Sequence, residues 1–226
     1  MIRILSKVYD HRDSDSWANS LRKQRFSLFT SILESLSLPI KILDVGGTVK
    51  FWENTGLLDQ EKKNIDITLL NLSFPTINST YTNIKQVVGD ARNMVNFYSN
   101  EFDIVFSNSV IEHVGSYHEQ RQMANEVMRV GKRYYVQTPY LFFPIEPHFI
   151  FPFFQFFPLN LRVWLLTNFS LGWYGKVAPQ HEAREIVTSI RLLSQREFVN
   201  LFPEAKLYKE KLLGLTKSLI VYGECP

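Results

Sequence analysis

The stretch that decides the fold is Lys41-Ile42-Leu43-Asp44-Val45-Gly46-Gly47-Thr48, residues 41–48. Its apolar run ends in an acid and two glycines, a pattern that predicts a buried strand ending at a tight turn. Because glycine has no side chain, the backbone there can turn sharply and approach a ligand closely. In an open α/β sheet the carboxyl end of such a strand faces the ligand crevice. We therefore expect a ligand beside this turn.

The segments that follow alternate between strand-like and helix-like patterns. Apolar runs predict further buried strands over residues 67–72, 84–88, 102–107 and 133–137. Helical spacing predicts helices over 14–36, with Ser14 or Asp15 as the cap, over 118–130 and near 194–201. Two last strand-like runs, 206–213 and 217–222, flank Gly214-Leu215-Thr216 and predict an antiparallel hairpin. Together these patterns predict an α/β fold with a doubly wound, mostly parallel sheet and helices on both faces.

Composition narrows the class of protein. A chain of 226 residues suits a single domain, and a net charge of +3 is too small to indicate nucleic-acid binding. The one cysteine, Cys225, excludes a disulfide framework and a thiolate metal site, and no other residues have the spacing of metal ligands. The polar, charged residues 9–16 do not resemble a signal peptide, so we expect a cytoplasmic protein.

Residues 140–175 differ from the rest of the chain. They contain nine of the eighteen phenylalanines, and Glu146 and Arg162 are their only formal charges. Four prolines interrupt the apolar runs, so the segment is too broken for a membrane span of roughly 20 residues. We interpret residues 140–185 as an aromatic-rich insertion before the last helix. It has three alternative roles: a cap over the substrate crevice, a homodimer face, or peripheral membrane contact through residues 141–174.

Each predicted parallel strand ends in a polar residue: Asp44, Asn71, Asp90, and Ser107 with Asn108. Because the carboxyl ends of parallel strands meet at one edge, these side chains are expected to converge on one nucleotide-like ligand. The amide of Asn71 can both donate to and accept from a ribose diol. Asp90, followed by Ala91, can accept from an exocyclic adenine amine.

The chain resembles the class I S-adenosylmethionine-dependent methyltransferases, mainly over residues 40–140. The matching stretches are Ile-Leu-Asp-Val-Gly-Gly at 42–47, Val-Gly-Asp-Ala at 88–91 and Phe-Asp-Ile-Val-Phe-Ser-Asn-Ser-Val-Ile-Glu-His-Val at 102–114. The resemblance implies one domain over residues 1–226, with an N-terminal helical cap at 1–40 and seven strands, the last antiparallel. It also implies S-adenosylmethionine as cofactor, with Asp44, Gly46 and Gly47 around its amino-acid moiety, Asn71 at the ribose, Asp90 and Ala91 at the adenine, and Ser107 and Asn108 on the methyl-donor side.

Two other functions stay open at this stage. Thr48 and Lys50 stand where the family often has glycines, and Asn71 replaces an acid, which would suit a degenerate relative that acts as a binding module. A nicotinamide-dependent oxidoreductase is the weaker alternative. A dinucleotide-binding site requires the motif Gly-x-Gly-x-x-Gly, and residues 46–51 lack its second and third glycines.

Catalytic candidates follow the fourth and fifth strands. Glu112 and His113 come after the fourth, and Glu146 and His148 lie in Phe-Pro-Ile-Glu-Pro-His. An alcohol acceptor needs a general base, most often His or a carboxylate, so we predict His113, Glu146 and His148 as catalytic. The alternatives are a helix cap for His113 and a structural pair for Glu146 with His148. The same stretch resembles bacterial methyltransferases of cell-surface polysaccharide or lipid-linked sugar biosynthesis, which implies O-methylation of a small or glycan/lipid-type acceptor rather than nucleic acid.

Overall fold

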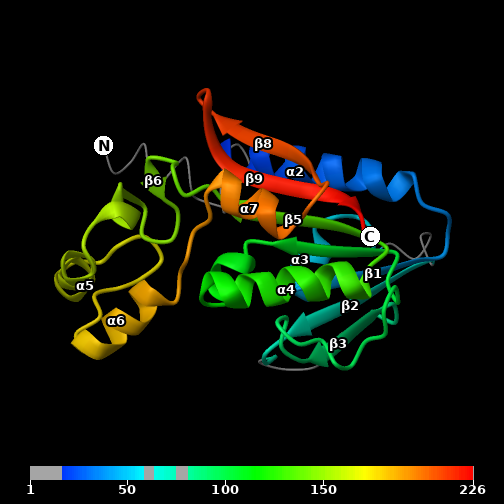
Figure 1. The fold of residues 1–226 in the computed structure, drawn as a ribbon, viewed down its shortest axis with the longest axis horizontal. Helices are drawn as coiled ribbons and strands as arrows, with labels where there is room; N and C mark the ends of the chain where they lie inside the picture. The colour runs from blue at the N-terminus through cyan, green and yellow to red at the C-terminus, as the bar shows by residue number, and fades with distance from the viewer. Residues whose placement is uncertain (1–16, 59–63, 75–80, 226) are drawn as a thin grey trace.

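A seven-stranded sheet with the strand order β3-β2-β1-β4-β5-β9-β8 runs through the molecule (Figure 1). The computed structural model describes residues 17–58, 64–74 and 81–225, with side chains from residue 23 onward. The sheet contains β1 (Ile40–Val45), β2 (Ile65–Asn71), β3 (Ile84–Val88), β4 (Ile104–Asn108), β5 (Arg133–Pro139), β8 (Lys206–Leu212) and β9 (Leu215–Glu224). Strands β1 to β5 pair in parallel, and β9 is antiparallel to both β5 and β8. The predicted mostly parallel sheet with an antiparallel last strand is confirmed.

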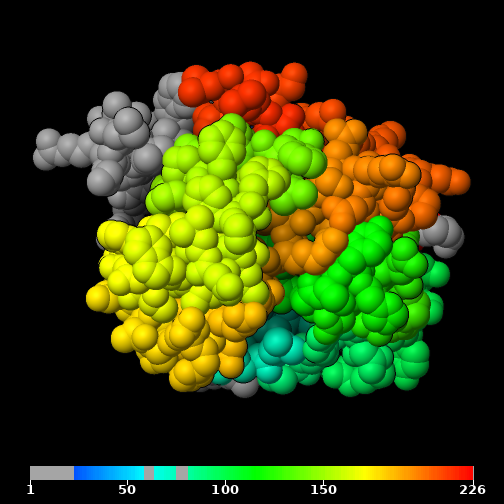
Figure 2. Space-filling view, turned by 60° about the vertical axis from the view of Figure 1, so that its left-hand side comes forward, coloured from blue at the N-terminus to red at the C-terminus, as the bar shows by residue number. Residues whose placement is uncertain are grey.

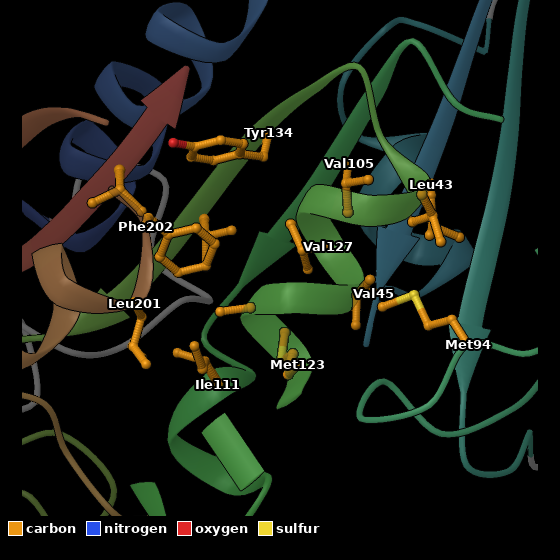
Figure 3. Packing of buried hydrophobic residues seen from close by; sticks show 14 of the residues in the cluster. Leu43, Val45, Met94, Val105, Ile111, Met123, Val127, Tyr134, Leu201 and Phe202 are labelled. Carbon is orange, nitrogen blue, oxygen red and sulfur yellow. The ribbon is translucent and has the colours of Figure 1, made fainter. Parts of the chain in front are cut away.

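Buried side chains of the central strands alternate between the two faces of the sheet, because successive residues of a strand point to opposite sides. On β1, Leu43 and Val45 belong to one core, and Ile42 belongs to the core on the other face. Figure 3 shows the first core, where Leu43 and Val45 lie near Met123 and Val127. A strand buried on both faces explains why the successive residues Ile42 and Leu43 are both apolar.

Helices α4 (Tyr117–Val130) and α7 (Gln195–Leu201) cover this first face. Each begins with a capping box, in which a serine and a glutamate satisfy each other's backbone N–H groups. Ser116 and Glu119 form the box of α4, and Ser194 and Glu197 form that of α7. Both helices were predicted within one residue of their observed starts.

The opposite face is covered by α2 (Trp17–Glu34) and the short α3 (Val49–Glu53). Phe29 of α2 and Trp52 of α3 are fully buried, and the Phe29 ring lies 4.6 Å from the ring of Phe106 between centroids. The helix predicted over 14–36 is therefore present, whereas its predicted caps, Ser14 and Asp15, lie outside the described residues.

The C-terminal hairpin turns one residue earlier than predicted. Leu213 and Gly214 both have positive φ angles, +51° and +81°, and Leu212 pairs with Leu215 across the turn. Two central residues with positive φ define the two-residue turn that matches the twist of a hairpin. The turn therefore consists of Leu213 and Gly214 and shares only Gly214 with the predicted Gly214-Leu215-Thr216 segment, and β9 starts at Leu215.

The segment between β5 and α7 has a small core of its own. Its elements are β6 (Ile145–Glu146), β7 (Phe151–Pro152), the 3₁₀-helix η3 (Phe154–Phe156), α5 (Leu159–Asn168) and α6 (Gln180–Thr188). Phe149, Phe154 and Leu166 are buried together there, separate from the two cores of the sheet. Figure 2 shows this segment, from yellow-green to light orange, as a continuous block on one side of the molecule.

No helix among the described residues combines the length and the apolar composition that crossing a bilayer requires.

Candidate active site

The turn after β1 depends on two glycines. Gly46 has a φ of +78°, and a Cβ at this position would overlap the side chain of Val110. A Cβ on Gly47 would overlap the carboxylate of Asp44. Both residues therefore have to be glycine for this turn to form, and no side chain of theirs covers the backbone. The turn has the form that binding a ligand through backbone groups requires.

The side chain of Asp44 packs against this turn from the protein interior. Its side chain is buried, and its Oδ2 accepts a hydrogen bond of 2.7 Å from the indole N–H of Trp52. Burial disfavours the carboxylate and raises the pKa of Asp44 to about 7, although the hydrogen bond from Trp52 opposes the shift. Asp44 lies near the end of β1, as predicted from the sequence, and its buried side chain helps to shape the turn.

Asn71 also holds the turn. It ends β2, and the parallel register sets it beside Val88 at the end of β3. Its side-chain N–H donates to the backbone oxygen of Gly47 at 2.8 Å. The amide oxygen is left to accept from a ligand, so Asn71 can position the turn and contact a ribose at the same time.

Asp90 follows β3, and its carboxylate is held by Arg92. The guanidinium binds both carboxylate oxygens at 2.7–3.0 Å and also contacts Glu119 at the start of α4. Hydrogen bonds from Arg92 lower the pKa of Asp90, which keeps this group ionised. An adenine amine at Asp90 would share the carboxylate with Arg92. The neighbouring Ala91 is half-buried against the core of the first face.

The side chains of the two predicted residues at the end of β4, Ser107 and Asn108, point in opposite directions. Ser107 is fully buried, and its hydroxyl donates to the backbone oxygen of Val45 at 3.4 Å. Asn108 points the other way, lines a cavity, and accepts a hydrogen bond of 3.1 Å from Arg25 of α2. The alternation of strand side chains places only one of two successive residues at the cavity.

A cavity of about 1050 Å³ opens at this end of the sheet. It extends from Thr48 at the turn, past Asn108, to Pro147 and Trp173 of the aromatic-rich segment. The charged residues of its lining are Lys23, Arg25, Lys50, Glu210 and Lys217. Neither Asn71 nor Asp90 lines it. The cavity therefore adjoins the amino-acid side of the predicted cofactor site and continues towards the aromatic-rich segment.

Beside this cavity, three of the predicted catalytic residues form a chain of contacts. His148 Nδ1 lies 2.7 Å from Glu146 Oε1, and His148 Nε2 lies 3.1 Å from His113 Nε2. The other oxygen of Glu146 accepts the backbone N–H groups of His148 and Phe149 at 2.7 and 2.8 Å. Since a carboxylate only accepts, His148 carries a proton on Nδ1, and the contact between the two Nε2 atoms requires a proton on one of them.

The pKa values of the two histidines move in opposite directions. Burial opposes protonation of His148, but its hydrogen bond to Glu146 and the charge of Glu146 outweigh this effect and raise its pKa. His113 keeps an exposed edge, yet burial of its ring and then the charge of His148 lower its pKa to about 4. His113 is therefore neutral at pH 7 and available as a lone-pair donor.

Glu112 lies next to these histidines and is fully buried. It belongs to the 3₁₀-helix η2 (Ile111–His113), and its Oε2 accepts a hydrogen bond of 3.0 Å from the hydroxyl of Thr138. The other oxygen, Oε1, has no hydrogen-bond partner. Burial raises the pKa of Glu112 to about 7.

One donor atom each of Glu112, His113 and His148 lies within 4.8 Å of the others. The sequence showed no metal-ligand spacing, because 35 residues separate the two histidines along the chain. Strand order placed Glu112 and His113 after the fourth strand and Glu146 and His148 after the fifth, at the same end of the sheet, but it did not predict that donor atoms of Glu112, His113 and His148 meet within 4.8 Å.

The part of the chain that contains the glycine turn and the ends of β1 to β4 matches a known protein family. Residues 43–134 match the family model described as a methyltransferase domain. No curated protein matches the sequence.

Several solved structures share the fold. A CurJ carbon methyltransferase is 12% identical with a TM-score of 0.55, and the match covers 88% of this chain and 52% of that protein, so this chain spans about half its length. A SAM-dependent methyltransferase from Aquifex aeolicus is 10% identical with a TM-score of 0.52 (98% and 92% covered). A putative zinc-dependent alcohol dehydrogenase from Rhodobacter sphaeroides is also 10% identical, with a TM-score of 0.51 (85% and 86% covered). Such distant likenesses show the fold alone, and function has to be argued from the site.

Proposed function

We propose that this chain, whose residues 43–134 match a methyltransferase domain, transfers the methyl group of S-adenosylmethionine to a hydroxyl oxygen of a glycan- or lipid-type acceptor. The observation that carries this proposal is the chain of contacts from Glu146 through His148 to His113 beside a large cavity. A hydroxyl has to lose its proton to become a good nucleophile, and a histidine held by a carboxylate is suited to this task.

The residues of the turn fit the cofactor. Gly46 and Gly47 leave the backbone uncovered, and Asn71 holds the turn while keeping its amide oxygen for a ribose. S-adenosylmethionine supplies an electrophilic methyl group on a positively charged sulfur. In this proposal Asp44 supports the turn, Asp90 and Ala91 adjoin the adenine, and Asn108 with Ser107 behind it forms the methyl-donor side.

His148 and Glu146 have distinct roles in this mechanism. Glu146, anchored by two backbone N–H groups, fixes the ring of His148 and its tautomer. In this proposal His148 draws the proton from the acceptor hydroxyl through Nε2, the nitrogen that lies 3.1 Å from His113 Nε2. The alternative of a purely structural Glu146–His148 pair leaves the exposed edge of His113 without a purpose.

The lining of the cavity and the surface around it favour an amphipathic acceptor. Apolar rings such as Phe143 and Trp173 lie in the lining together with cationic side chains. The aromatic-rich segment has six aromatic side chains that are half exposed or more, of which Trp173 also lines the cavity: Phe142, Phe153, Phe156, Trp164, Phe169 and Trp173. Exposed aromatic clusters of this kind mark membrane or protein contacts. We propose that residues 141–174 touch the membrane surface from which a lipid-linked acceptor is taken.

Transfer of a labelled methyl group from S-adenosylmethionine tests the reaction. Lipid-linked glycans in vesicles and the matching water-soluble glycans are the acceptors, and the methylated atom is identified by mass spectrometry. His148→Gln should lower the rate on the order of 10²–10⁴-fold while S-adenosylhomocysteine still binds. His118→Gln, an exposed histidine of α4, is the matched control and should keep the wild-type rate. Methylation on nitrogen or carbon, or full activity of His148→Gln, would contradict the proposal.

Vesicle co-sedimentation tests the membrane contact. Trp164 and Phe169 pack against each other at 5.8 Å between centroids and are both about half exposed. The double variant Trp164→Ser/Phe169→Ser should stay in the supernatant, whereas Tyr98→Ser, which alters an exposed aromatic residue elsewhere, should sediment like wild type. If the wild type does not sediment but forms a dimer that the double variant loses, the segment is a dimer face instead.

A further inference from the structure

The polar cluster beside the cavity brings together three donor atoms from distant parts of the chain. Glu112 and His113 come from η2 after β4, and His148 comes from the loop after β6. One donor atom of each lies within 4.8 Å of the others. Two imidazoles and one carboxylate around a common point form the donor set that first-row divalent metal ions favour.

The geometry of the two imidazoles fits a shared ion. Their Nε2 atoms are 3.1 Å apart, and Nδ1 of His148 is directed to Glu146, so Nε2 is the nitrogen of His148 that can bind an ion when it is deprotonated. Metal–nitrogen bonds are about 2.1 Å, so two ligands of a tetrahedral ion lie about 3.4 Å apart. The two imidazole nitrogens already lie near this separation.

Glu146 is not one of the three metal ligands, but it binds the second ring nitrogen of the ligand His148. Metal-binding histidines usually donate their second ring N–H to a carboxylate, which fixes the ring and strengthens the ligand. Glu146 does this for His148 and is itself anchored by the backbone N–H groups of His148 and Phe149. A purely structural ion pair would not need to direct the free nitrogen of His148 towards a second histidine and a second carboxylate.

Glu112 supplies an independent observation. Its side chain is completely buried, and Oε1 has no partner although Oε2 is bound by Thr138. A buried polar atom without a partner costs roughly 1–3 kcal/mol, so proteins rarely leave one without a reason. A cation between Glu112 and the two histidines would satisfy this oxygen.

We propose that Glu112, His113 and His148 bind one divalent first-row transition-metal ion, with Glu146 orienting His148. Three protein ligands leave coordination positions open, as in catalytic metal sites. Ser109 and Pro147, close neighbours of the ligands in the chain, line the cavity, so the proposed site adjoins it.

The role of this ion rests on the proposed function. A hydroxyl of the acceptor that coordinates the ion has a lower pKa, and its proton passes to solvent water. His148 then acts as a ligand instead of as the proton acceptor. Neighbouring hydroxyls of a glycan could chelate the ion and so position the oxygen to be methylated.

Metal binding is measured directly, without acceptor or activity. Untagged full-length protein is treated with chelator and titrated with Co²⁺, whose visible absorption reports the ligand field, and then with Zn²⁺ in a calorimeter. We expect one ion per chain. Glu112→Gln and His148→Gln should abolish the Co²⁺ absorption, and Glu146→Gln should weaken binding about 10–100-fold. His118→Gln, outside the cluster, should bind like wild type.

The result that overturns the proposal is the absence of Co²⁺ and Zn²⁺ binding by wild type at millimolar metal, or equal binding by wild type and His148→Gln. Binding of S-adenosylhomocysteine by each variant shows that it is folded. The two proposals fail separately. Methyl transfer that persists in excess chelator removes the metal from the reaction but keeps O-methylation. Metal binding without O-methylation of any acceptor removes the proposed reaction but keeps the site.

Discussion

The strongest stability prediction concerns Asp44, the buried carboxylic acid beneath the glycine turn. Its ordinary pKa is 3.8, and burial raises it to about 7 in the folded protein. The folded state therefore binds this proton more tightly than the unfolded state. Stability from this group is fully present below pH 4 and is lost as the pH rises through 7. At about 1.4 kcal/mol per pH unit, the loss amounts to about 4 kcal/mol.

The variant Asp44→Asn removes this titration while its side-chain oxygen can still accept from Trp52. Urea unfolding followed by circular dichroism gives the free energy of unfolding of both proteins at pH 5, 6, 7 and 8. Relative to the variant, wild type should lose about 2 kcal/mol between pH 5 and pH 7 and little more above it. Asp66→Asn, an exposed position on β2, shows what an amide substitution does by itself. A wild-type-minus-variant difference that stays constant with pH would refute the reasoning.

Two smaller predictions concern Arg92 and Gly172. Arg92→Ala breaks the partly exposed ion pair with Asp90, so urea titration should show a loss of no more than about 1 kcal/mol; a loss near 3 kcal/mol would contradict this view of the pair. Gly172 has a φ of +54°, and a Cβ there would overlap the backbone oxygen of His148. Gly172→Ala should therefore lower the thermal midpoint more than Gly214→Ala, which also has positive φ but open space around it. Equal shifts would show that only the backbone angle matters.

The sheet could be predicted from the sequence because its signals are local. A strand buried on both faces has to be apolar over most of its length, and successive apolar residues mark both strands: Ile42 and Leu43 in β1 and residues 104–106 in β4. Turn residues then mark where each strand ends. The hairpin was displaced by one residue because positive φ at Leu213, a residue that rarely adopts it, has no signal in the sequence.

The side-chain contacts at the strand ends could not be predicted from the sequence. Residue order places Asp44, Asn71, Asp90 and Asn108 at one edge of the sheet, as expected. It does not show that Arg92 already holds Asp90, or that Ser107 faces inward with its hydroxyl on Val45. Those contacts depend on side-chain direction and on partners, which a strand pattern does not encode.

The sequence by itself determined the order of the strands, the glycine turn and the resemblance to methyltransferases, because periodicity and turn chemistry act between residues close in the chain. Only the tertiary structure decided that Glu112, His113 and His148 meet at one point. The two histidines are 35 residues apart in the chain, in segments joined by α4, β5 and the loop that follows β5. Contacts of that kind follow from the packing of whole elements, so no spacing in the sequence could have predicted them.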